Sequence, residues 1–229
     1  MIKQEKFVKP AQFAEQKIIN AITSKEWGIG RNLLPERELA EFLGITRPTL
    51  REVLQRLARD GWITIKHGRP TIINDYLSNG GLGILKSLIS NKELSAITLA
   101  RDWLELRILV LPDLAYKAIQ LNRSEIVNIL ENTPDLNATN EEFARFDWNL
   151  QLHLIRHSEN SIVKMLYNDL TEIYHKEGAI YFSNNQIKRK TLDYYIRLKT
   201  AILHHDHEIK YIIKQIMQDS LKTWENINH

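Results

Sequence analysis

The hydrophobic pattern of residues 10–74 changes its period, and this change constrains the fold more than any other feature of the chain. Apolar residues recur every three to four positions in the segments 10–25, 35–43 and 46–60, which predicts three amphipathic helices. Residues 62–65 and 70–74 are instead rich in β-branched and aromatic side chains, with a turn-forming segment at 66–69 between them. They predict a short β-hairpin. The expected order is three helices followed by a hairpin.

Residues typical of helix caps lie at the expected ends of the second and third helices. Gly44 follows the second helix, at the position where a left-handed cap residue is expected. Thr46 is a favourable N-cap for the third helix, and Gly61 ends it. A helix, a glycine-containing turn, a second helix and a hairpin together predict a winged helix-turn-helix over residues 1–74.

The remainder of the chain has a helical period nearly to its end. The glycines at 80, 81 and 83 suggest a linker over residues 75–83, followed by an all-α helical bundle domain over 84–229. The fold class is therefore mainly α, with an N-terminal winged helix-turn-helix domain and a C-terminal helical domain. The helices are expected near 84–91, 94–121, 123–132, 139–157, 161–182, 186–205 and 207–226.

Composition excludes several classes of protein. The chain has no cysteine, which excludes disulfides and thiolate metal sites. It shows no signal peptide and no apolar run of membrane-spanning length, so we expect a cytoplasmic protein without a membrane partner. It also lacks a phosphate-binding glycine loop, a nucleophile elbow and an HExxH motif, so we expect no enzyme.

Positive charge is concentrated in the N-terminal third. Residues 1–78 hold 13 Lys and Arg against 9 Asp and Glu, a net charge of +4, whereas residues 79–229 hold 18 against 19, a net of −1. A polyanion is a favourable partner for such a segment, because each neutralised phosphate releases counterions. Charge alone does not separate this interpretation from chance unevenness.

The first turns of the second and third predicted helices carry cationic and hydroxyl side chains that suit DNA. The second helix of a helix-turn-helix presents its N-terminal residues to the major groove, where arginine can bond guanine O6 and N7. Threonine hydroxyls suit phosphate oxygens, and a glycine at the hairpin tip permits a tight turn against DNA. Two further arginines of the third helix, Arg56 and Arg59, are expected to be merely solvated. The predicted double-stranded DNA interface consists of Arg37, Thr46, Arg47, Pro48, Thr49, Arg51, His67 and Gly68.

The sequence resembles the GntR superfamily of bacterial regulators, and within it the fatty-acid-responsive FadR subfamily. The resemblance is most specific in the run TLREVLQRLARDGW at 49–62 and in IKHGRPT at 65–71. It continues more weakly through FDWN at 146–149, EGAIYF at 177–182 and the Ser220 to Trp224 segment. Two differences are a proline one place later than usual in LLPER at 33–37, and Pro48 in place of a common threonine.

This resemblance implies a homodimer that binds a palindromic operator, with the predicted interface residues other than Pro48 at DNA-contacting positions. It also implies an all-α sensor domain, which in related regulators often binds a metal through one aspartate and three histidines. Here Asp147 matches the first position, but Gln151, Tyr195 and Gln218 align with the histidines. The pair His153 and His157 has a legitimate metal spacing, although an ordinary histidine pair is favoured. We therefore expect no metal and no cofactor.

In the FadR subfamily the effector is long-chain fatty acyl-CoA, which needs an apolar tunnel for its tail and polar or cationic groups for its phosphates. From spacing alone the aromatic residues would be ordinary core, and Arg107 would pair with Glu105 or Asp102. Met217 occupies a position where the subfamily is expected to have a small glycine. The residues that the resemblance assigns to acyl-CoA are Arg107, Tyr174, Tyr181, Phe182, Ser220, Lys222 and Trp224.

The sequence thus predicts a DNA-binding transcription regulator of fatty-acid metabolism genes that acyl-CoA releases from its operator. The alternative is a GntR-type regulator that responds to a different small molecule, such as a carboxylic acid.

Overall fold

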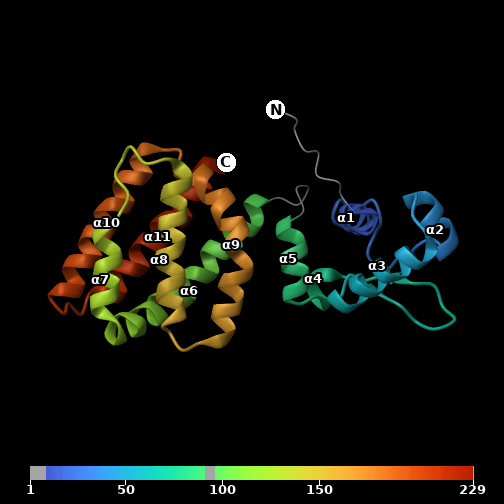
Figure 1. Ribbon diagram of the computed structural model, residues 1–229, viewed down its shortest axis with the longest axis horizontal. Coiled ribbons are helices and arrows are strands. Elements are labelled where there is room, and N and C mark those ends of the chain that lie inside the picture. Colours follow the sequence, from blue (N-terminus) through green and yellow to red (C-terminus); the bar gives the residue numbers. More distant parts are fainter. Residues whose placement is uncertain (1–8, 91–95, 229) are drawn as a thin grey trace. The chain divides into compact units, whose positions relative to one another are not determined.

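The computed structural model describes residues 9–90 and 96–228, which fall into two compact units, Met1–Leu94 and Ser95–His229. Figure 1 shows the helices of both units and the hairpin of unit 1. No helix within the described ranges combines the length and the apolar character that crossing a bilayer requires.

Unit 1 confirms the predicted winged helix-turn-helix. Its helices α1 (Pro10–Thr23), α2 (Glu36–Leu43) and α3 (Arg47–Asp60) precede a hairpin of β1 (Ile63–Thr64) and β2 (Ile72–Ile73). The strands are antiparallel, with Ile63 opposite Ile73, and an additional bridge joins Asn32 to Ile72. Helices α1 and α2 both pack on α3, which buries its apolar face of Leu50, Val53, Leu54 and Leu57.

Two glycines set the limits of the helix-turn-helix. Gly44 ends α2 with φ +68°, and Gly61 ends α3 with φ +97°, both in the left-handed region that favours glycine. At Gly61 space is also restricted, because a Cβ atom there would lie 3.0 Å from the backbone oxygen of Asn79. Glycine is therefore required at this position for two independent reasons.

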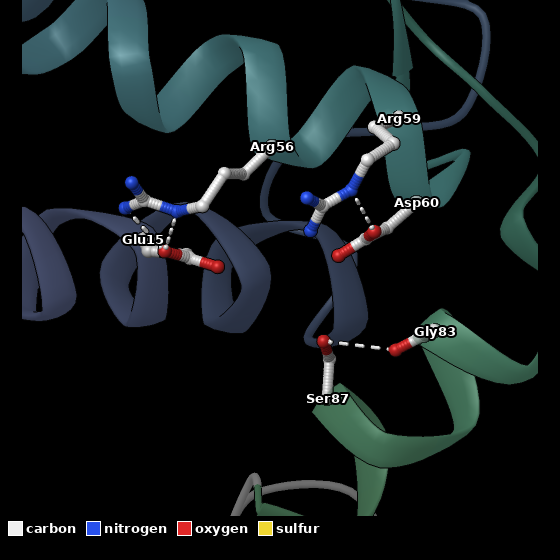
Figure 2. Close-up of polar contacts among 6 residues, drawn as sticks. All are labelled: Glu15, Arg56, Arg59, Asp60, Gly83 and Ser87. Atoms are coloured by element: carbon white, nitrogen blue, oxygen red, sulfur yellow. Dashed lines mark hydrogen bonds and ion pairs between the residues drawn. The ribbon is translucent and has the colours of Figure 1, made fainter.

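Arg56 and Arg59 differ in their surroundings, as Figure 2 shows. The Nε and Nη2 atoms of Arg56 donate to Glu15 Oε2 of α1 at 2.9 and 2.7 Å, so Arg56 links α3 to α1. The expectation that Arg56 is merely solvated was wrong, because sequence spacing does not reveal a partner 41 residues away. Arg59 has a 72% exposed side chain, and its Nε atom lies 3.1 Å from the carboxylate of its neighbour Asp60.

The segment expected to be a linker, residues 75–83, instead contains α4 (Tyr76–Asn79) and the start of α5 (Leu82–Ser90). The Tyr76 ring lies 5.0 Å from the ring of Trp62, and Ile84 and Leu88 are buried. A Cβ atom at Gly83 would lie 3.2 Å from the side chain of Asp60. Gly80 and Gly83 thus permit close packing in this segment, and the two compact units divide at 94/95.

Unit 2 is the expected all-α bundle. Its helices are α6 (Ala96–Leu121), α7 (Arg123–Glu131), α8 (Asn140–Arg156), α9 (Ser161–Tyr181), α10 (Asn185–Leu203) and α11 (Ile209–Asn228). Helix α8 packs mainly on α9, and α6 packs mainly on α11 and α8 (Figure 1). A capping box fixes the start of α8, because Thr139 accepts from the Glu142 amide while the Glu142 carboxylate accepts from the Thr139 amide.

Candidate functional site

The N-terminal end of α3 is exposed and is organised by its own threonines. Thr46 caps the helix by accepting a hydrogen bond from the Thr49 amide at 3.4 Å, and their hydroxyl oxygens lie 2.8 Å apart. Arg47 and Pro48 form the first exposed turn, and a proline there removes no helical hydrogen bond. Within the described part of unit 1, the face of α3 opposite its buried leucines is therefore exposed, as entry into a DNA groove requires.

The three predicted DNA-reading arginines are all exposed but differ in their partners. Arg51 Nε donates to Glu36 Oε2 at 2.8 Å, which joins the first turn of α2 to the second turn of α3. Arg37 Nε donates to Glu41 Oε1 at 3.2 Å within α2. Arg47 makes no ion pair with the residues that the structure describes. It can thus engage a base without first giving up a carboxylate.

The hairpin forms the wing. The Arg69 amide donates to the Lys66 carbonyl at 3.2 Å, and Gly68 has φ +68°, so the tip closes in a tight turn. His67 is exposed at this tip. A groove lies between the wing, Ile65–Thr71, and the Pro35–Glu36 segment at the start of α2. The structure therefore brings the predicted wing residues near the helix-turn-helix, as a DNA interface requires.

Unit 2 contains a cavity of about 50 Å³ between α6, α8, α9, α10 and α11. Its walls are mainly apolar and aromatic. Six of the seven residues predicted for acyl-CoA line it, whereas Lys222 is exposed and does not. Met217 is also in the wall and is buried. The six are Arg107, Tyr174, Tyr181, Phe182, Ser220 and Trp224.

Several further residues of the cavity wall were not predicted from the sequence. Ala100, Trp103 and Leu104 precede Arg107 on α6 at helical spacing and all face the cavity. Tyr194 of α10 and Ile173 of α9 also line it. The i, i+3, i+4, i+7 pattern that leads to Arg107 is the signal that could have identified the α6 residues.

A buried polar network lies at the cavity wall. Asp147 Oδ2 accepts from Gln151 Nε2 at 2.7 Å and from the Tyr174 hydroxyl, and Asp147 Oδ1 accepts from the Tyr195 hydroxyl at 2.7 Å. Arg107 Nη1 donates to Gln151 Oε1 at 3.4 Å, so Gln151 connects the guanidinium to the carboxylate. The network thus joins α6, α8, α9 and α10.

The alternative pairing of Arg107 with Glu105 or Asp102 was wrong. Glu105 instead accepts from Arg101, its exposed neighbour one turn earlier, at 2.9 Å. Arg107 is 3% exposed, and its Nε atom makes no hydrogen bond with the described residues. An unpaired buried donor is costly, so this guanidinium retains capacity for an anionic or carbonyl ligand.

The network also shifts the pKa values of its arginine and tyrosine side chains. Burial lowers the pKa of Arg107, but the interactions with Tyr174 and Asp147 outweigh it, and the net pKa is raised. Burial and the Asp147 charge raise the pKa of Tyr174 and of Tyr195 well above the ordinary value for tyrosine. Arg107 therefore stays cationic and both hydroxyls stay protonated donors at neutral pH.

The positions that hold a metal in related sensor domains do not suit one here. Gln151 and Tyr195, which align with two of the histidines, already donate to Asp147. Gln218, aligned with the third histidine, is exposed and does not line the cavity. Amide and phenol groups are poor substitutes for imidazole as metal ligands. The absence of a metal at Asp147 stays a prediction.

Two family models and the curated relatives all match this chain to bacterial regulatory proteins. Residues 10–73 match the family described as "Bacterial regulatory proteins, gntR family", and residues 74–229 match "FadR C-terminal domain". The chain is 34% identical over 219 residues to a "Fatty acid metabolism regulator protein" of Shewanella amazonensis, covering 95% of this chain and 91% of that protein. It is 38% identical over 190 residues to a protein of the same description from Pectobacterium atrosepticum, covering 83% and 80%.

The fold has a counterpart among solved structures. The structure of Lar, described as controlling the expression of the Listeria monocytogenes agr system, aligns with a TM-score of 0.62 at 15% identity. The alignment covers 97% of this chain and 99% of Lar. At this level of identity the likeness supports the fold alone.

Proposed function

The chain belongs to the GntR family of bacterial regulatory proteins, carries a FadR C-terminal domain and is a DNA-binding transcription regulator, and we propose that it controls fatty-acid metabolism genes. In this proposal, long-chain fatty acyl-CoA binds in the cavity of unit 2 and releases the protein from its operator. Relatives from two genera are described as fatty acid metabolism regulators, which supports the class of target gene.

The observation that carries the effector proposal is the cavity with its buried arginine. Apolar and aromatic side chains provide a lining that suits an acyl chain. Arg107, with an unpaired Nε atom, supplies one cationic group for a polar part of the ligand. The exposed Lys222 lies one turn or less from Ser220 and Trp224 of the wall, so it is available to a CoA phosphate outside the cavity.

The small volume of the cavity suggests how a bound ligand changes the conformation of unit 2. About 50 Å³ is far below the roughly 300–1,000 Å³ of typical ligand pockets, so an acyl chain must move helices apart to enter. Helix α6, which carries Arg107, is the first helix of unit 2 in the sequence. In this proposal, a displacement of α6 changes the conformations available to the DNA-binding unit. Ligand and operator then favour different conformations.

We extend the proposal to assembly and location. A homodimer would present two α3 helices to successive major grooves, which a palindromic operator with half-sites about one helical turn apart would accept. Operator binding takes place where the chromosome lies, so the proposed location is the cytoplasm.

The direct test is operator binding at fixed salt with and without oleoyl-CoA, using a duplex selected by the protein from a random-sequence pool. We expect oleoyl-CoA to raise the apparent Kd for the operator at least tenfold, because the ligand-bound conformer no longer fits both half-sites. Fluorescence anisotropy of the labelled duplex measures this. Free CoA and oleate are the matched controls. Unchanged operator affinity at saturating oleoyl-CoA would eliminate the acyl-CoA proposal.

A second effector class is supported by the same arginine. A small carboxylic acid fits a cavity of about 50 Å³ more easily than an acyl chain does, and a carboxylate would satisfy Arg107. Short-chain carboxylates tested in the same anisotropy assay distinguish the two. Release by such an acid, without release by oleoyl-CoA, would favour this alternative.

Met217→Ala provides a prediction with opposite effects on stability and on ligand response. Met217 is 3% exposed and fills the cavity wall, so its truncation should cost about 2–5 kcal/mol of unfolding free energy. The enlarged cavity reduces the work of opening, so the oleoyl-CoA concentration for half-release should fall by roughly several-fold. Urea unfolding and the anisotropy titration measure the two quantities.

Met165→Ala is the matched control, because Met165 is 54% exposed on α9 and does not line the cavity. It should leave both quantities near their wild-type values. A half-release concentration that is unchanged or higher in Met217→Ala would show that Met217 does not limit ligand entry.

A further inference from the structure

Glu125, His153 and His157 form a cluster on the side of unit 2 where α7 and α8 meet. Glu125 lies in the first turn of α7, His153 in the last turn of α8, and His157 caps α8. One potential ligand atom from each residue, an imidazole nitrogen or a carboxylate oxygen, lies within 4.8 Å of the other two. None of the three lines the cavity described above.

The potential ligand atoms of the cluster lie close to one another. Glu125 Oε1 lies 3.3 Å from His153 Nε2, and Glu125 Oε2 lies 3.8 Å from His157 Nε2. A tetrahedral Zn²⁺ with ligands at about 2.0–2.1 Å separates its ligand atoms by about 3.3 Å. The two imidazole rings are also adjacent, with centroids 4.5 Å apart. Small side-chain rotations would therefore bring all three ligands onto one ion.

His153 provides a second, independent observation. Its Nε2 atom is buried and makes no hydrogen bond with the described residues, although Glu125 Oε1 is close. A buried nitrogen without a hydrogen bond is costly, and a metal ion would satisfy it.

We propose that Glu125, His153 and His157 bind one Zn²⁺ ion per chain, with a water molecule as the fourth ligand. Two imidazoles and one carboxylate suit Zn²⁺ better than Mg²⁺, which prefers six oxygen ligands. The ion would join the start of α7 to the end of α8. This proposal is independent of the effector, because the three ligands lie outside the cavity.

The test is isothermal titration of ZnCl₂ into EDTA-treated full-length protein that carries no histidine tag, with MgCl₂ titrated in parallel. We expect the wild type to bind Zn²⁺ saturably, with one equivalent per chain at this cluster. In Glu125→Gln and in His157→Gln that equivalent should be absent, or its Kd should rise at least tenfold. We expect no comparable Mg²⁺ binding. At about a hundredfold excess over Kd, Zn²⁺ should raise the Tm of the wild type by about 5–10 °C and that of the variants by less.

The variants should fold, because the side chains of Glu125 and His157 are 51% and 33% exposed. Equal Tm values of wild type and variants in EDTA verify this. His205→Gln is the matched control, since His205 is an exposed histidine in the turn between α10 and α11, and it should retain the equivalent. Absence of saturable Zn²⁺ binding, or wild-type binding by both variants, overturns the proposal. So does loss of the equivalent from His205→Gln alone.

Discussion

Replacing Arg47 by alanine is expected to weaken specific operator binding by about 1–3 kcal/mol, which is roughly 5- to 150-fold in Kd. Arg47 lies in the first turn of α3, is exposed, and makes no ion pair with the described residues. Its guanidinium is therefore the most available of the three arginines for a bidentate bond to guanine. Anisotropy titration of wild type and variant against the selected operator, at one salt concentration, measures the loss.

The matched control is Arg59→Ala, which removes the same charge from the last turn of the same helix. Arg59 is 72% exposed and contacts Asp60, so its removal should change operator affinity far less. Titration against a scrambled duplex separates base reading from phosphate contact. If Arg47→Ala weakens both duplexes equally and lowers the salt slope by about 1, Arg47 contacts a phosphate and reads no base. Unchanged affinity for the operator would remove Arg47 from the interface.

Asp147→Ala should cost unit 2 about 3–5 kcal/mol of unfolding free energy, because it leaves a buried guanidinium without its counter-charge. Asp147 is 8% exposed and accepts hydrogen bonds from Gln151, Tyr174 and Tyr195. Its removal deprives the Tyr174 and Tyr195 hydroxyls of their acceptor, whereas Gln151 Nε2 keeps the Tyr174 oxygen at 3.2 Å. It also removes the Asp147 charge that favours the buried Arg107 cation. Urea unfolding followed by tryptophan fluorescence measures the change.

Asp147→Asn is the informative comparison, because it keeps the shape and one acceptor oxygen while it removes the charge. We expect a loss between the wild type and Asp147→Ala. A second comparison is the double variant Asp147→Ala with Arg107→Met, in which the uncompensated cation is also absent. Recovery of part of the lost stability in the double variant supports the electrostatic cause. A loss below about 1 kcal/mol in Asp147→Ala would mean that water or relaxation compensates the cation.

Helix positions could be predicted because their causes are local. The third predicted helix, 46–60, agrees with α3 because Thr46, the leucine period and Gly61 all act within one or two turns. The hairpin followed from β-branched residues on either side of a glycine turn. The glycines at 80, 81 and 83 predicted a linker, whereas the structure has α4 and the start of α5 in this segment. Gly80 and Gly83 allow close approach to Gly61, the Tyr76 carbonyl and Asp60, which is a tertiary property.

Of the seven residues predicted for acyl-CoA, six line the cavity of unit 2 and Lys222 does not. Tyr174 and Tyr181 share one face of α9 by their spacing, and both line the cavity. Lys222 lies between the wall residues Ser220 and Trp224 in sequence. A side chain two residues further along a helix lies on a different face, so Lys222 is exposed. A resemblance transfers positions along the chain, whereas the direction of each side chain depends on helix phase.

The sequence by itself determined which segments form helices, where the hairpin lies, and which arginines occupy the exposed turn of α3, since periodicity and capping act over a few residues. Only the tertiary structure decided which distant side chains meet. Arg107 reaches Gln151 across 44 residues, and Tyr195 reaches Asp147 across 48. Glu125 likewise comes to lie beside His153 only when α7 and α8 pack. Such encounters depend on how whole helices pack, and no local pattern in the chain encodes them.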